Sequence, residues 1–186
     1  MTKPASYGST LWAHYARVWS PPIEQLTMTR GPIRPLPPDF QVLVIPRSPD
    51  SMAYATRCMS QPEDDERLEL HVLAPHDRQH DSMIVELLTV VAHFHRTGAR
   101  LGLGHTVNFG RPWLPGSLCS YGLISLPYLD GPTLEWEETT HTRFLWLIPI
   151  TEAEKNFKVA NGVDALEQRF EEASFHYLDP LRPSVV

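Results

Sequence analysis

The feature that most constrains this chain is an apolar run at residues 144–150 that leads directly into a helix-start signal. The run contains no polar side chain, which is typical of a strand buried within a sheet. Thr151 followed by Glu154 is a capping-box pattern, which begins a helix. A nearly continuous apolar run at 40–45 predicts a second strand buried on both faces. We therefore expect a sheet that helices cover, with a central strand over 142–150.

Hydrophobic spacing and turn residues predict the remaining elements. Residues 68–72 alternate apolar and polar side chains, so this strand is expected to expose one face. Asp81 is expected to cap the helix that follows it, and Gly98 to end that helix. The order of strands and helices predicts a single α/β or α+β domain over residues 1–186, with a mixed sheet flanked by helices. The predicted strands are 40–45, 52–58, 68–72, 121–126 and 142–150, and the predicted helices are 9–19, 82–97 and two within 151–173.

Proline is unusually frequent, with 18 residues against 10 glycines. Disordered chains can share that bias, but aromatic residues make up 10% of this chain and include five tryptophans, which indicates a packed core with stiff loops. The proline-rich segment 31–38 is expected to be extended and packed on the surface of the domain. Three further segments are expected to be loops, namely the acidic 61–66, 102–116 and the acidic 129–140.

The net charge excludes some functions and favours others. Sixteen Lys and Arg residues against 22 Asp and Glu residues give a net charge of −6. An acidic protein repels the phosphate backbone, which argues against direct nucleic-acid binding and suits a basic partner. Residues 1–6 lack the apolar stretch of a signal peptide, and no apolar run approaches the ~20 residues of a membrane-spanning helix. We expect a soluble cytoplasmic protein with no membrane contact.

Several segments resemble one known family. They are 56–62, Gly104-His105-Thr106, 144–154, 162–167 and 179–186. Together they are similar to the suppressor of fused (SUFU) domain family, over nearly the whole chain after the first helix. Cys58 stands where the family usually has glycine, so the backbone there is expected to be less bent.

The resemblance implies a protein-binding module with no catalytic residues and no cofactor. The eukaryotic namesake has two domains and sequesters a transcription factor, and this chain is similar to its N-terminal domain only. Stand-alone bacterial members look like immunity proteins, each of which binds a sibling toxin and blocks it. The resemblance thus favours an immunity protein, with a regulator that sequesters a transcription factor or another partner as an alternative.

Nine histidines raise a metal-dependent hydrolase as a further alternative. His76 and His80 are spaced like two ligands on one helix face, with Asp77 and Asp81 beside them. No glutamate follows His76 as the base of a metalloprotease would. Because a polar helix entry explains the segment as well, no bound metal is expected.

Candidate partner-binding residues lie in the predicted loops. Trp136 stands among carboxylates at 135–138, and Trp is a favoured hot-spot residue, while carboxylates speed the approach of a basic partner. A second acidic patch lies at 63–66. Trp113 is a third candidate, with the alternative that it fills the core. The full candidate set is Glu63, Asp64, Asp65, Glu66, Trp113, Glu135, Trp136, Glu137 and Glu138.

The leading hypothesis from the sequence is inhibition by occlusion. An acidic face would dock on a basic toxin domain and cover its working surface. A nuclease is the natural example, because its substrate groove must be basic. The oligomeric state is left open.

Overall fold

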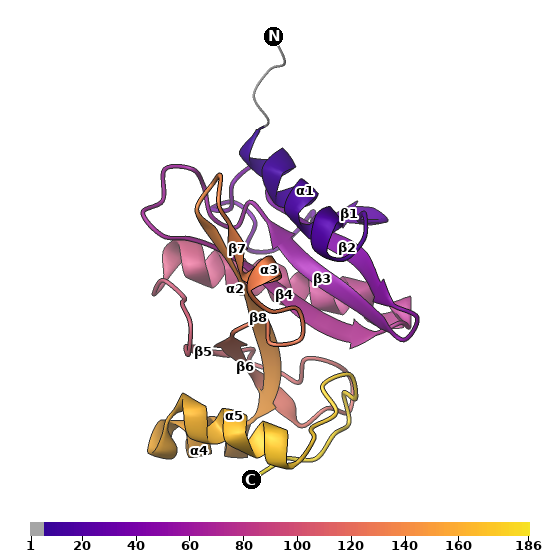
Figure 1. Ribbon diagram of the computed structural model, residues 1–186, viewed down its shortest axis with the longest axis vertical. Helices are drawn as coiled ribbons and strands as arrows, with labels where there is room; N and C mark the ends of the chain where they lie inside the picture. Colours follow the sequence, from indigo (N-terminus) through magenta and orange to yellow (C-terminus); the bar gives the residue numbers. More distant parts are fainter. Residues whose placement is uncertain (1–5) are drawn as a thin grey trace.

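The strand β8 (Thr142–Thr151) lies in the centre of an eight-stranded mixed sheet in the computed structural model, which describes residues 6–186 (Figure 1). Helices lie on both faces of this sheet, so the predicted single α+β domain with a mixed, helix-flanked sheet is confirmed. The part of the predicted domain that falls on residues 1–5 lies outside the described residues. Within residues 6–186, none of the helices combines the length and the apolar content that crossing a bilayer requires.

The sheet is antiparallel except at one pair of neighbours. β4 and β8 run parallel, with Leu70 opposite Leu145. β7 (Trp136–Glu137) pairs with the first two residues of β8 and stands off the main path. Along that path the strands are β1 (Glu24–Leu26), β2 (Gln41–Ser48), β3 (Ser51–Arg57), β4 (Arg67–Pro75), β8, β6 (Cys119–Ser125) and β5 (Thr106–Asn108).

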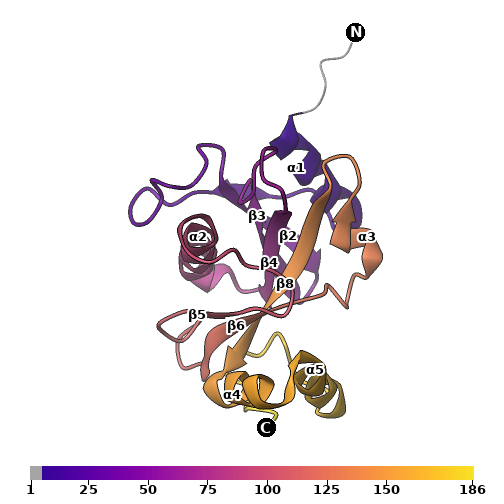
Figure 2. The same cartoon turned by 90° about the vertical axis from the view of Figure 1, so that its left-hand side faces the viewer.

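Helices cover each face of the sheet. α2 (Asp81–Thr97), preceded by the short 3₁₀ helix η1 (Arg78–His80), covers one face. Figure 2 shows α1 (Tyr7–Val18), α3 (Pro132–Glu135) and α5 (Val163–Glu172) on the opposite face, while α4 (Glu152–Asn161) follows directly at the end of β8. The helix predicted over 9–19 is thus observed over Tyr7–Val18, with Ser6 as its cap.

Alternation along β8 divides the core into two. Phe144, Trp146 and Ile148 point to the core shared with α1 and α5. Leu145 and Leu147 point to the core shared with α2. A strand with apolar side chains on both faces cannot sit at a solvated surface, which is why the run at 144–150 forms the centre of the sheet.

The helix signals after β8 are confirmed, and the cap predicted for α2 is wrong. Thr151 Oγ1 accepts from the Glu154 amide at 3.2 Å, and Glu154 Oε2 accepts from the Thr151 amide at 2.8 Å, which completes the capping box. The cap position of α2 is His80, which makes no side-chain capping bond. Asp81 lies in the first turn instead, where its carboxylate accepts from Tyr54 Oη and from Arg78 Nε.

The prediction that β4 exposes one face is wrong. Glu69 and His71, the polar members of the alternation, are 0% and 1% exposed. Glu69 is covered because three donors from the neighbouring β3 and its exit turn surround its carboxylate. His71 lies against Trp19 and Trp146, with ring centres 5.1 and 6.5 Å away.

Several connections differ from expectation. Residues 31–38 form consecutive turns and are not extended, and Leu36 reaches the core with 8% exposure. The segments 102–116 and 129–140 were predicted as loops, but they contain β5, α3 and β7. Cys58 has φ +64°, so its backbone takes the left-handed bend and is not less bent than a glycine would be.

Candidate functional site

A pocket with a volume of about 370 Å³ opens where β4 and β8 begin. These two strands are parallel neighbours, so the segments that precede them, residues 61–66 and 138–141, meet at one edge of the sheet. The third side is closed by His95 of α2 and by Arg100 and Leu101 after it. Two of the three predicted surfaces, which are far apart in the sequence, therefore lie at one site, which we call the Trp136 pocket.

Trp136 forms one wall of the pocket and leaves 46% of its surface exposed. It lies in β7, opposite Arg143 of β8. The guanidinium of Arg143 lies 5.3 Å from the centre of the indole ring, and it also pairs with Glu135 at 2.8 Å. A cation–π contact thus orients the indole ring while almost half of the side chain stays open to solvent.

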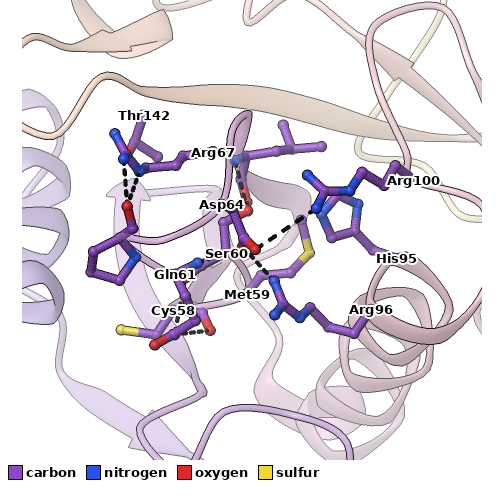
Figure 3. Close-up of polar contacts among 12 residues, drawn as sticks. Cys58, Met59, Ser60, Gln61, Asp64, Arg67, His95, Arg96, Arg100 and Thr142 are labelled. Atoms are coloured by element: carbon purple, nitrogen blue, oxygen red, sulfur yellow. Dashed lines mark hydrogen bonds and ion pairs between the residues drawn. The ribbon is translucent and has the colours of Figure 1, made fainter.

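The acidic loop on the opposite side is built around Asp64. The Asp64 carboxylate accepts from the Gln61 amide at 2.8 Å. It also pairs with Arg96 of α2 and, at 4.0 Å, with Arg100 (Figure 3). These contacts tie the loop to the end of α2, so Asp64 serves the shape of the pocket and is not available to a partner.

Arg67 joins the two loops that frame the pocket. Its guanidinium donates to the Pro62 carbonyl at 3.1 Å, in the acidic loop, and to the Thr140 carbonyl at 2.6 Å, in the connection before β8. Both bonds satisfy backbone groups that no strand partner reaches. The Trp136 pocket is therefore held at a fixed width before any partner arrives.

His95 adds a hydrogen-bond donor to the wall of the pocket. The side chain is 6% exposed, and its Nδ1 accepts from the Leu101 amide at 3.0 Å. Burial, together with the positive charge of Arg96, lowers the pKa of His95. The ring is therefore neutral and carries its proton on Nε2.

The carboxylates of the predicted set fall into two groups. Glu135 pairs with Arg143, and Glu137 accepts from Thr139 and Thr140. Burial opposes the ionisation of Glu137, but the hydrogen bonds from Thr140 and Thr139 outweigh it and hold the Glu137 pKa below its usual range. The other carboxylates of the predicted set, Glu63, Asp65, Glu66 and Glu138, are exposed and make no ion pair with the part of the chain that the structure describes.

Trp113 lies elsewhere. It is 2% exposed and belongs to the core on the α2 face of the sheet. It lines no part of the Trp136 pocket. A residue so deeply buried reaches no partner directly, and we leave it out of the proposed surface.

The histidine pair does not form the arrangement that the metal alternative needs. α2 begins at Asp81, so His76 lies outside the helix and shares no helix face with His80. His76 Nδ1 instead lies 2.8 Å from the Pro49 carbonyl. Within residues 6–186, no three His, Cys, Asp or Glu side chains come together as metal ligands would.

The pocket combines groups suited to recognition. Three cations line it together with Asp65 and Glu66, and none of them belongs to the predicted set, namely Arg67, Arg100 and Arg143. Leu68, Leu103 and Leu145 supply apolar surface. A second imidazole, that of His141, lines the pocket beside His95. The lining therefore offers charge pairing, stacking on Trp136, apolar contact and the imidazoles of His95 and His141.

Comparison with known proteins agrees with the fold. The family model for the suppressor of fused protein (SUFU) matches residues 37–183. A crystal structure from Neisseria gonorrhoeae, described as a SUFU homologue, is 34% identical over 97% of each chain with a TM-score of 0.83. No match is found among the curated proteins.

Two more distant structures share the fold. A crystal structure of the Sufu–Fu complex aligns with a TM-score of 0.70 at 15% identity, over 98% of this chain and 93% of that one. Drosophila Suppressor of Fused aligns with a TM-score of 0.68 at 14% identity, over 94% of this chain and 50% of that one. From the family match and the bacterial homologue, the chain belongs to the suppressor of fused (SUFU) protein family.

Proposed function

We propose that this chain is a non-enzymatic protein-binding module, and that its partner is a basic toxin domain that it neutralises by covering the working surface. The observation that carries the proposal is the Trp136 pocket. A half-exposed Trp lies beside a hollow of about 370 Å³ whose rim carries unpaired carboxylates. Aromatic anchors next to concave surface are the usual centre of a protein interface.

The pocket is organised before binding. Arg143 packs on the Trp136 ring and pairs with Glu135. Arg67 and Asp64 make the contacts that fix the two loops framing the pocket. Ordering an interface side chain on binding costs roughly 0.5–1.5 kcal/mol, so side chains that are already fixed leave more of the contact energy for affinity.

The exposed carboxylates around the pocket favour a basic partner. Asp64 and Glu135 pair with the arginines nearest to them. Glu63, Asp65, Glu66 and Glu138 remain as exposed charges, in a chain of net charge −6. A carboxylate-rich rim accelerates association with a cationic surface and can occupy a groove that otherwise binds phosphates.

The relatives support the class of function and not the identity of the partner. One solved structure of this fold is the Sufu–Fu complex, so a protein with this fold does bind another protein. The Neisseria gonorrhoeae homologue shares the fold over 97% of each chain, which supports the use of one family-wide fold for protein binding. The proposal that the partner is a toxin rests on the charge of the chain. It also rests on the resemblance between stand-alone bacterial members of the family and immunity proteins.

The first test is the substitution Trp136→Ala. Removing a central aromatic anchor should weaken binding roughly tenfold or more. The measurement is isothermal titration against the purified basic protein that affinity purification with the wild-type chain identifies. Val159→Ala, at an apolar residue that is 75% exposed on α4, is the matched control and should change the affinity less than about twofold. Equal affinities of the two variants for the partner would show that Trp136 is not part of the interface.

The second test is ionic strength. Because exposed charges are screened over about 10 Å at 0.1 M salt, affinity should fall between 50 and 500 mM NaCl. The double substitution Asp65→Asn/Glu66→Gln should flatten this dependence. An affinity that stays constant across the salt range would refute a basic partner. It would not contradict protein binding as such.

A further inference from the structure

A second hollow, of about 260 Å³, lies on the opposite face of β8 from the Trp136 pocket. Arg143 and Leu145 line the first pocket, whereas Trp146 and Ile148, one position out of phase, line the second. Successive side chains of a strand point to opposite faces, so one small contact cannot fill both hollows. We call the second hollow the aromatic groove. It is formed by β8, α5, residues 128–129 and residues 174–177.

The groove keeps apolar surface in contact with water. Tyr128 and Leu129 at its mouth are 57% and 44% exposed, although both belong to residue types that pack readily. Trp146 in its wall is 4% exposed, and its indole N–H has no hydrogen-bond acceptor within residues 6–186. Contiguous exposed apolar surface with a polar rim marks an interaction site.

The walls of the groove are fixed by contacts among the aromatic residues that line it and with Arg182. Phe170 of α5 stacks on Phe175 with ring centres 4.3 Å apart, and Trp146 meets Tyr177 edge to face at 5.5 Å. Arg182 lies over the Phe175 ring at 5.3 Å. The groove is therefore a built feature of the fold and not a gap between mobile side chains.

The charge at the mouth selects the occupant. Glu167 accepts from Ser125 Oγ and from Tyr128 Oη at 2.8 Å, both neutral donors, so its negative charge is not balanced. Burial and the neighbouring Glu167 raise the pKa of Tyr128 to about 12, so the phenol stays neutral and the charge at the mouth comes from the carboxylates. Glu171 also lines the groove and is exposed, and the ion pair of α5 joins Glu172 to Arg169 without it.

We propose that the aromatic groove is a second docking site, which takes an apolar side chain from a segment of a partner protein that carries Lys or Arg on either side of it. The apolar side chain fills the hollow against Trp146 and Phe175. The flanking cations meet Glu167 and Glu171. This inference goes beyond the proposed function, because it uses the other face of the sheet and does not involve Trp136.

The test uses a defined peptide, acetyl-KKFKK-amide, and the full chain labelled with ¹⁵N. We expect a saturable shift of the Trp146 indole N–H signal, assigned by its loss in Trp146→Phe, and of the backbone signals of residues 174–177. The matched peptide acetyl-KKSKK-amide lacks the apolar side chain and should bind roughly tenfold more weakly, because it buries little apolar area.

Two variants and one control locate the site on the chain. Glu171→Lys should weaken binding of acetyl-KKFKK-amide roughly fivefold, because it turns an attraction into a repulsion. Glu152→Lys makes the same charge change at an exposed residue on α4 that does not line the groove, and should change the affinity less than about twofold. Leu129→Ser tests the apolar mouth without a charge change and should weaken binding by a similar factor to Glu171→Lys.

Each alternative result overturns the inference. These results are no saturable shift at the groove, equal binding of the two peptides, equal effects of Glu171→Lys and Glu152→Lys, and loss of peptide binding in Trp136→Ala. Retention of peptide binding by Trp136→Ala, with loss of the toxin, separates the groove from the proposed function.

Discussion

Glu69 is a buried carboxyl group that makes no ion pair within residues 6–186. It is 0% exposed and accepts from Thr56 Oγ1 at 2.6 Å and from the amides of Met59 and Ser60 at 3.2 Å each. Burial raises the Glu69 pKa to about 8, against the effect of these hydrogen bonds. Glu69 thereby holds the turn at Cys58, whose backbone is left-handed, and so fixes where the acidic loop of the Trp136 pocket begins.

A pH-dependent stability follows at this residue. The folded chain keeps the Glu69 proton up to about pH 8, while the unfolded chain loses it near pH 4.5, the ordinary pKa of a glutamate. The unfolded state therefore binds fewer protons between these limits, and the Glu69 contribution to stability falls as pH rises from about 5 to 8. Glu69→Gln should lose roughly 1–2 kcal/mol at pH 5 for a disturbed buried hydrogen bond. It should lose progressively less at higher pH.

The measurement is the free energy of unfolding in urea at pH 5, 6.5 and 8 for the wild type and the variant. His71 acts in the opposite sense, because burial lowers its pKa to about 3 and the unfolded chain takes up its proton first as pH falls. His71 is present in both the wild type and Glu69→Gln, so its contribution cancels when their free energies of unfolding are subtracted at each pH. Glu63→Gln, at an exposed carboxylate, is the control, and a Glu69→Gln difference that does not change with pH would contradict the account.

At the scale of elements, one buried ion pair fastens the C-terminal segment to β8 and α4. Arg182 donates to both carboxylate oxygens of Glu154, at 2.7 and 2.8 Å, and to the Pro149 carbonyl at 3.0 Å. Glu154 also accepts from the Val185 amide at 3.1 Å while it closes the capping box of α4. Arg182 and Glu154 are 4% and 0% exposed, so neither charge is solvated if the other is lost.

Breaking this pair from one side should therefore be costly. Glu154→Gln leaves the Arg182 charge buried and unpaired, and should lower the free energy of unfolding by roughly 3–5 kcal/mol. The double variant Glu154→Gln/Arg182→Met removes the stranded charge and should recover part of that loss. Thermal and urea unfolding of the wild type and the three variants, including Arg182→Met, give the coupling energy. Losses that simply add would show that the two residues act independently.

The main elements could be predicted from the sequence because their signals are local. The apolar run at 144–150 and the Thr151–Glu154 capping box depend on neighbours in the chain, and both are observed. β1 and β7 have three and two residues, and only their pairing with β2 and β8 makes them strands. The burial of β4 was missed for the same reason, since the donors to Glu69 come from residues 56–60 after folding.

On the scale of the whole molecule, the candidate site depends on the parallel pairing of β4 and β8. Trp136 and the acidic loop were predicted separately as partner-binding residues, and nothing local indicates that they meet. The cations Arg67, Arg100 and Arg143 escaped notice because each stands alone in the sequence. The sequence predicts Asp64 and Glu135 as exposed charges in loops, but in the fold each makes an ion pair with an arginine.

The fold also places two recognition surfaces on opposite sides of one strand. The Trp136 pocket lies on the α2 side of β8, and the aromatic groove lies on the α5 side. Both expose aromatic surface, and both carry unpaired carboxylates. We therefore expect binding at one surface to survive substitutions at the other, with additive effects on affinity.

The most direct test of the account is quantitative affinity purification from cells that express the chain naturally. Immobilised wild type, Trp136→Ala and Val159→Ala would be compared by mass spectrometry of the retained proteins. The account predicts that a basic protein is retained by the wild type and by Val159→Ala, and is reduced roughly tenfold with Trp136→Ala. Retention of the same proteins in equal amounts by all three would contradict it.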